Sequence, residues 1–182
     1  MTQGSKCLVI DTDIASSAGG ENAQATRSKQ CREVLMTVRE ASHKVVVTEM
    51  ISEEWRKHQS NFTRTWLRSM YAKRKVCQLD VPTNNVLRHK VEQGVVEEKK
   101  RNAMLKDIHL IETALETDKT VISMDETVRF YFHEVTQKIA ILRNIAWVNP
   151  SKDDKLCIEW LHNGAESAKE RLLAYYKTDR DS

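Results

Sequence analysis

The most constraining feature of the sequence is a short apolar run near its start that ends in acids. Leu8, Val9 and Ile10 are followed directly by Asp11 and, two residues later, by Asp13. A continuous run of β-branched and other apolar residues is typical of a strand that is buried on both faces of a parallel sheet. In open α/β sheets the ligand crevice lies at the carboxyl ends of such strands. The run therefore predicts a buried strand that delivers Asp11 to a ligand crevice.

Three further apolar runs share the features of buried strands. They cover residues 44–48, 120–124 and 145–148, and the second of them is followed by Asp125 and Glu126. Between the runs, apolar residues recur every three or four positions, as on the buried face of a helix. Strands that alternate with helices predict an α/β fold with three layers, α/β/α, around a central, mostly parallel sheet.

The helices predicted from this spacing occupy most of the remaining chain. Thr48 is suited to cap a helix that begins at Glu49. The apolar and aromatic residues from 55 to 76 predict one long helix, and the segment 165–177 is expected to form a terminal helix.

The length and composition favour one folded domain. A chain of 182 residues with 40% hydrophobic and 30% charged residues can bury a substantial core and is unlike a disordered segment. We expect a single domain over residues 1–182, with a helical insert at about 56–102 and C-terminal helices at about 151–178. The net charge of +3 is too small to indicate a nucleic-acid partner by itself.

The sequence carries no pattern typical of export or of membrane insertion. The first apolar run is short and is followed by aspartates, and no stretch approaches the roughly 20 apolar residues of a membrane span. The four cysteines are scattered and form no C-x-x-C pair. We therefore expect a cytoplasmic protein with reduced thiols and no membrane partner.

Four carboxylates are candidates for one metal site. Asp11 and Asp125 follow predicted strands. The third candidate is one of Glu53 and Glu54, which open the helix after the second strand, and the fourth is Asp107, which is expected near the start of a helix that precedes the third strand. Clustered carboxylates repel one another, whereas Mg²⁺ or Mn²⁺ prefers oxygen ligands and would neutralise them. Such an ion can activate water and stabilise the charge that develops on a phosphodiester.

Each acid also has a structural interpretation. Asp13 is suited to cap a turn, and Asp125 to cap the following helix, a role that is compatible with metal binding. One of Glu53 and Glu54 is explained by the positive end of its helix dipole, and Asp107 taken alone is typical of a surface acid. The six histidines show no zinc spacing and are interpreted as incidental.

A set of basic residues falls on one side of the predicted 55–76 helix, opposite its aromatic residues. The set consists of Lys57, Arg64, Arg68 and Lys75. Such a stripe can follow a phosphate backbone and so predicts an RNA-binding face. An ordinary solvated helix face explains the same pattern equally well.

Taken in order, these segments resemble the PIN-domain nucleases. The resemblance is carried by the LVID segment ending at Asp11, the EEW segment ending at Trp55, the KDIHL segment that contains Asp107, and the VISMD segment ending at Asp125. It spans roughly residues 7 to 150. The ordered set is more specific than any single motif.

The resemblance implies an endoribonuclease that hydrolyses RNA with Mg²⁺ or Mn²⁺ and acts as a toxin or defence effector. The implied catalytic residues, which are also the implied metal ligands, are Asp11, Glu54, Asp107 and Asp125. Glu54 is preferred to Glu53 because it directly precedes the aromatic residue, as is common in the family. Additional candidates for the site are Asp13, Glu53, Ser123 and Glu126.

One departure from the family concerns the second metal ion. Many members carry a further acid two positions after the last one, whereas here Thr127 stands at that position and Glu126 lies one residue earlier. RNA is the expected partner. A homodimer, and an antitoxin or another complex partner, remain open.

Two other functions remain open at this point. The Asp-x-Asp pair formed by Asp11 and Asp13 after a strand is also the opening motif of haloacid-dehalogenase-like phosphatases, although the later lysine and acid motifs of that class have only a poor counterpart here. The other alternative is a PIN-like module without catalytic activity that binds RNA or a protein partner.

Overall fold

Five parallel strands form the central layer of the protein, whose computed structural model describes residues 4–152 and 154–177. The strands are β1 (Cys7–Ile10), β2 (Lys44–Val47), β3 (Val76–Gln78), β4 (Thr120–Ile122) and β5 (Ala146–Val148). Their order across the sheet is β3-β2-β1-β4-β5, so β1 lies in the centre. The predicted three-layer α/β/α fold is confirmed, and the four strand pairs of this sheet are all parallel.

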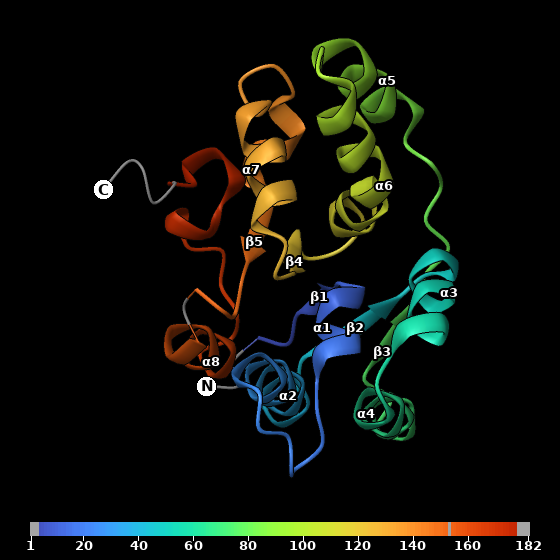
Figure 1. Ribbon diagram of the computed structural model, residues 1–182, viewed down its shortest axis with the longest axis vertical. Coiled ribbons are helices and arrows are strands. Elements are labelled where there is room, and N and C mark those ends of the chain that lie inside the picture. The colour runs from blue at the N-terminus through green and yellow to red at the C-terminus, as the bar shows by residue number, and fades with distance from the viewer. Residues whose placement is uncertain (1–3, 153, 178–182) are drawn as a thin grey trace.

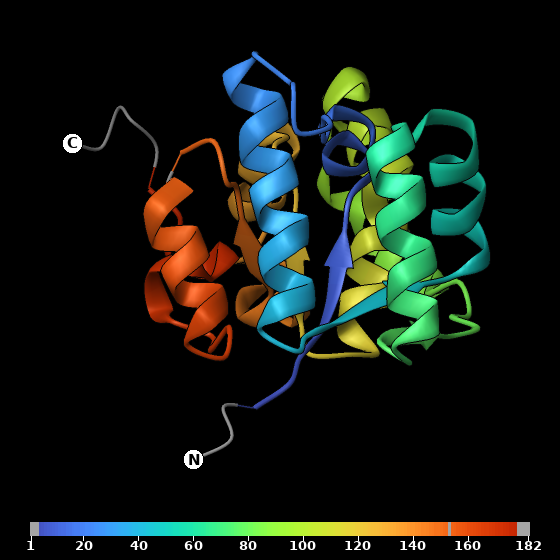
Figure 2. The ribbon, with the colours of Figure 1, turned by 90° about the horizontal axis from the view of Figure 1, so that it is seen from below.

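Helices cover both faces of this sheet (Figure 1). One face carries α5 (Asn85–Gly94), α6 (Glu98–Leu115) and α7 (Glu126–Glu134). The opposite face carries α2 (Thr26–Glu40), α4 (Asn61–Ala72) and α8 (Asp154–His162), and Figure 2 shows α2 between the other two. The helices that directly follow β1 and β2 contact each other; they are α1 (Thr12–Ser17) and α3 (Glu49–His58).

The register of the central strands brings two strand ends side by side. Ile10 of β1 pairs with Ile122 of β4, and both side chains are fully buried. The ladder continues for one more hydrogen bond, because the amide of Asp11 donates to the carbonyl of Ile122 at 3.0 Å. Asp11 and Ser123 therefore leave the sheet at the same level.

The predicted helix over 55–76 is wrong, because the chain breaks at Gln59 and Ser60. The Ser60 hydroxyl accepts a hydrogen bond from the amide of Thr63 at 3.1 Å and so caps a new helix, α4. After α4 the chain forms β3, an edge strand that lies inside the helical insert predicted at 56–102.

The aromatic residues on either side of this break belong to the core, as their spacing predicts. Trp55 of α3 and Trp66 of α4 are each 2% exposed, and their ring centroids lie 6.4 Å apart. Trp66 also donates its indole N–H to the carbonyl of Leu35 in α2 at 2.6 Å. The predicted cap of α3 is confirmed, since Thr48 Oγ1 accepts from the amide of Ile51 at 3.2 Å.

The C-terminal segment contains the expected helix α8 but not the helix predicted over 165–177. That segment instead forms two short 3₁₀ turns, Lys169–Arg171 and Leu173–Tyr175. The amide of Leu173 donates to the carbonyl of Ile145 at 2.9 Å, and a β-bridge joins the same two segments. The segment thus covers the β5 edge of the sheet, whose unpaired backbone groups would otherwise be exposed.

The cysteines correct the prediction that all four thiols are reduced. Cys7 of β1 and Cys77 of β3 form a disulfide, whereas Cys31 and Cys157 are buried. No short-range cysteine motif signals this pairing, because the two residues are 70 positions apart and only the fold brings them together. None of the helices in the described ranges has the length and apolar character needed to cross a bilayer.

Candidate functional site

The candidate site is built on the adjacent ends of β1 and β4. The hydroxyl of the fully buried Ser123 donates to Asp11 Oδ2 at 2.7 Å and lies 3.3 Å from Asp13 Oδ2. The Ser123 hydroxyl oxygen in turn accepts a hydrogen bond from the amide of Asp125 at 3.1 Å. Ser123 therefore ties together the acids that follow the two central strands.

Asp11 caps the short helix α1 while it faces the site. Its Oδ1 accepts from the amide of Thr12 at 2.6 Å, and its Oδ2 accepts from Ser123. Burial raises the pKa of Asp11, and the negative charge of Glu54 adds to this rise. The hydrogen bonds and the nearby His109 act in the opposite direction. The ionised form of Asp11 is therefore held in surroundings that disfavour it.

Asp13 has mainly a structural role. Its Oδ2 accepts from the amide of Met124 at 2.8 Å, which fastens α1 to the end of β4. Its Oδ1 is buried and has no hydrogen-bond partner within the described residues. Burial, followed by the charge of Asp11, raises the pKa of Asp13 to about 7. Asp13 therefore acts in the structure through a long-range contact and not as the cap of a local turn, the role that one interpretation of the sequence predicts.

Of Glu53 and Glu54, which are adjacent in α3, Glu54 is the one whose side chain faces the acids. Its Oε2 accepts from the hydroxyl of Thr12 at 3.0 Å and lies 3.4 Å from Nε2 of His109. Glu53 is exposed and lines a pocket with Arg88 and His109, and no hydrogen bond joins it to the acids among the described residues. The preference for Glu54 over Glu53 is therefore consistent with the geometry.

Asp107 reaches the site from the middle of α6, not from the start of a helix as predicted. Burial, followed by the charges of Asp11 and Asp125, raises its pKa to about 6, although Lys106 and His109 act in the opposite direction. These effects require the carboxyl groups to lie within electrostatic range of one another. The helix α6 packs against β1 and β4. This packing explains how Asp107, which lies between β3 and β4 in the sequence, comes close to the ends of β1 and β4.

The side chains of Asp125 and Glu126 point in different directions at the start of α7. Asp125 Oδ1 accepts from the amide of Val128 at 2.9 Å, so Asp125 is the cap of α7, as one interpretation of the sequence predicts. Glu126 turns away from the acids and accepts hydrogen bonds from Asn149 at 2.9 Å and from the Tyr176 hydroxyl at 2.7 Å. Glu126 therefore does not belong to the acid group.

The four predicted RNA-binding residues do not share one helix. Lys57 lies in α3, whereas Arg64 and Arg68 are exposed on α4. Lys75 follows α4 and donates to the carbonyl of Arg39 at 2.6 Å. The continuous stripe inferred from a single helix is therefore a wrong prediction, because the break at Ser60 changes the direction of the chain.

His109 is the residue of this site that sequence reasoning misses. It is 6% exposed, its Nδ1 lies 3.1 Å from the carbonyl of Lys106, and its Nε2 faces Glu54 without hydrogen-bond geometry. Its neighbours Ile108 and Leu110 are buried and apolar. An ionisable ring inside such a buried stripe, two residues from Asp107, is the signal that could have identified it.

These acids share one region without forming a closed set of metal ligands. In the part of the chain that the structure describes, no three His, Cys, Asp or Glu side chains are spaced to hold a metal ion. Asp11, Asp107 and Asp125 are nevertheless oxygen donors whose negative charges repel one another. Such a donor set fits the preference of Mg²⁺ or Mn²⁺, provided that side-chain rotations bring the oxygens onto one ion.

Comparison of the chain with protein-family models, with curated proteins and with solved structures gives no match. The chemistry of the site therefore has to be inferred from its own residues.

Proposed function

We propose that this protein is an endoribonuclease that hydrolyses RNA phosphodiester bonds with Mg²⁺ or Mn²⁺. The observation that carries the proposal is the approach of Asp11, Asp107 and Asp125 from three separate elements, with raised pKa values for Asp11 and Asp107. Partly burying several acids together is unfavourable, and groups with such perturbed pKa values are typical of functional sites. A purely structural role would be served better by neutral side chains.

The resemblance of the sequence to PIN-domain nucleases supports the same function. The four acids implied by that resemblance are Asp107, the two aspartates whose charges act on it (Asp11 and Asp125), and Glu54, which is linked to Asp11 through Thr12. The resemblance and the electrostatic argument are separate, because the first uses only motif order and the second uses only burial and charge.

In this function Asp11, Asp107 and Asp125 would hold the divalent ion. A bound ion would lower the pKa of a coordinated water and neutralise charge on the phosphodiester. The remaining residues position these groups: the Ser123 hydroxyl orients Asp11, and the Thr12 hydroxyl orients Glu54.

We infer that His109 and Glu54 act together as proton acceptors, because their side chains lie side by side. If Nδ1 carries a hydrogen and donates it to the carbonyl of Lys106, Nε2 is left to face Glu54 Oε2 at 3.4 Å. A proton released during hydrolysis can then be held on either of these two groups. This assigns His109 and Glu54 to proton transfer and the aspartates to ion binding.

The test is a cleavage assay on single-stranded RNA in Mn²⁺. Asp11→Asn is expected to reduce the rate by more than about a hundredfold, since even partners that only support metal ligands cost roughly 10–100-fold when removed. Glu54→Gln should also reduce it strongly, whereas Glu53→Gln, the same substitution on the exposed neighbour, should leave it within about twofold. Full activity in a folded Asp11→Asn protein would refute the assignment.

The same experiments separate the alternatives. Asp13 lies close to Asp11, since both carboxylates approach the Ser123 hydroxyl, but its Oδ2 is engaged by the backbone amide of Met124, which does not favour a phosphatase that needs Asp13 as a free acid. A covalent phosphate trapped on Asp11 would nevertheless establish the phosphatase function. RNA binding without cleavage in Mn²⁺ would establish the non-catalytic module.

A further inference from the structure

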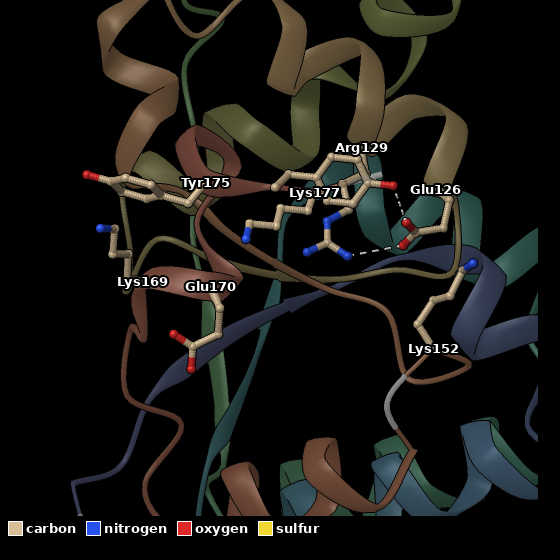
Figure 3. Close-up of a pocket in the computed structure, with 8 residues that line it drawn as sticks. Glu126, Arg129, Lys152, Lys169, Glu170, Tyr175 and Lys177 are labelled. Atoms are coloured by element: carbon tan, nitrogen blue, oxygen red, sulfur yellow. Dashed lines mark hydrogen bonds and ion pairs between the residues drawn. The ribbon is translucent and has the colours of Figure 1, made fainter. Parts of the chain in front are cut away.

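A pocket of about 720 Å³ lies between α7 and the C-terminal 3₁₀ turns (Figure 3). This volume is within the range of roughly 300–1,000 Å³ that is typical of small-ligand sites. Glu126 lines the pocket and directly follows Asp125, so the pocket adjoins the candidate active site in the chain. The function proposed above does not use it.

The pocket has an excess of positive charge. Its basic residues are Arg129, Lys152, Lys169 and Lys177. Its two acids are Glu126 and Glu170, and Glu126 is already engaged by Arg129 at 3.2 Å and by the Tyr176 hydroxyl. Like charges that converge on one cavity repel each other, and an anionic ligand relieves that repulsion.

Arg129 is the most buried of these cations. Its side chain is 11% exposed, and its guanidinium carbon lies 4.4 Å from the centroid of the Tyr176 ring. Its Nε is buried and has no hydrogen-bond partner among the described residues. Arg129 and Lys177 both line this pocket (Figure 3). A guanidinium that lines a pocket and is fixed by stacking on an aromatic ring is suited to bind a phosphate oxygen through its terminal N–H groups.

Tyr175 adds an aromatic surface to the same pocket. The Lys169 ammonium lies 4.5 Å from the centroid of its ring, and the Tyr175 side chain is still 49% exposed. An exposed ring beside a group of cations is the combination with which proteins bind single-stranded nucleic acid, since bases stack on the ring and phosphates pair with the cations.

We propose that this pocket binds one nucleotide of a single-stranded RNA, with the phosphate against Arg129 and Lys177 and the base against Tyr175. The inference rests on the proposed function in one respect, namely that the bound nucleotide belongs to the RNA that is cut at the neighbouring acids. A simple anion would use the cations alone, so the dependence on Tyr175 distinguishes a nucleotide from inorganic phosphate.

The test measures RNA binding in the absence of cleavage. An Asp11→Asn protein in EDTA is titrated against a fluorescent single-stranded oligoribonucleotide of mixed sequence, and anisotropy reports the dissociation constant at several salt concentrations. The pocket is changed in two ways: Lys169→Gln with Lys177→Gln removes two exposed cations, and Tyr175→Ala removes the ring. Tyr175→Phe keeps the ring and serves as the conservative control.

A matched charge control is available on α4, which lies toward the opposite edge of the sheet (Figure 1). Arg64→Gln with Arg68→Gln removes the same two charges from exposed positions there. This pair also tests the RNA-binding face predicted from the sequence. Thermal melting of every variant checks that the fold is retained.

The double lysine variant should weaken RNA binding by about tenfold. The slope of the logarithm of the binding constant against the logarithm of the salt concentration should become shallower by about 1.4, the value expected when two phosphate contacts to a single strand are lost. Tyr175→Ala should weaken binding by about tenfold, and Tyr175→Phe by less than about twofold. The α4 pair should have less than about a twofold effect. Unchanged binding in both pocket variants, or an equal loss in the α4 pair, would overturn the inference.

The outcome also separates this inference from the proposed nuclease function. RNA binding that depends on the pocket, in a protein that never cleaves RNA, would reject the nuclease function and leave the pocket assignment standing. Metal-dependent cleavage in a protein whose pocket variants bind RNA as the parent does would reject the pocket assignment alone.

Discussion

Replacing Asp13 with asparagine is expected to change how the stability of the protein depends on pH. Burial and the charge of Asp11 raise the pKa of Asp13 from 3.8 to about 7. Between these pH values the folded protein retains a proton that the unfolded chain has lost. The free energy of unfolding therefore falls as the pH rises from about 4 to about 7. Above about pH 7 the contribution of Asp13 to that free energy no longer changes.

The size of the effect follows from the difference between the two pKa values. A difference of about 3 corresponds to about 4 kcal/mol, because each unit is worth about 1.4 kcal/mol. Solvent has partial access to Asp13, which reduces the cost of its charge, so we expect about 2 kcal/mol. The asparagine side chain is neutral at every pH, and its carbonyl can still accept the hydrogen bond from Met124.

The assay is urea unfolding of the metal-free protein at a series of pH values. The Asp13→Asn variant should match the parent near pH ~4 and exceed its unfolding free energy by about 2 kcal/mol near pH ~8. Asp80→Asn, an amide substitution at an exposed position after β3, is the matched control. Profiles of the parent and the Asp13→Asn variant that run parallel across the whole range would show that the reasoning is wrong.

Three further predictions address the metal site, a buried ion pair and a tight turn. The affinity for Mn²⁺, measured by titration calorimetry, should increase as the pH rises through about 6 and then level off, because Asp107 must lose a proton to bind the ion. Glu112→Ala should cost about 3 kcal/mol in urea unfolding, because Glu112 is 5% exposed and holds Arg88 through two contacts of 2.8 Å; a loss below about 0.5 kcal/mol would contradict this. Gly19→Ala should cost about 1–2 kcal/mol, because the added Cβ would lie 2.5 Å from a side-chain carbon. Gly20→Ala, whose Cβ would meet nothing within 4 Å, should be nearly neutral. Equal melting temperatures of the two variants would contradict this prediction.

The fold was largely predictable because its central strands are buried on both faces. The runs that form β1, β2, β4 and β5 are continuous and apolar, and helical spacing between them indicates the layers on either side. The edge strand β3 was not predictable in this way, because Val76 and Cys77 are only partly buried and Gln78 is exposed. The apolar spacing of Trp55 and Trp66 also continues across the break at Ser60, which hides the end of α3.

The candidate site was predictable only where a strand delivers the residue. Asp11 and Asp125 follow buried runs, so the sheet itself determines where they emerge. Asp107 depends on how α6 packs against β1 and β4, which no local pattern specifies. His109 was missed because a single histidine within an apolar stripe is more commonly a core residue than a functional one. Glu126 was misplaced because its hydrogen bond to Tyr176 is made across 50 residues of the chain.

The central claim is that the acids at the ends of β1 and β4 and on α6 together bind one divalent ion. The most direct test is a crystal structure of the protein soaked in Mn²⁺, in which anomalous scattering locates the ion. We predict an ion bonded to a carboxylate oxygen of Asp11, with Asp107 and Asp125 rotated to complete its protein ligands. A Mn²⁺-saturated crystal in which no ion contacts Asp11, and these acids contact only protein atoms, would contradict the claim.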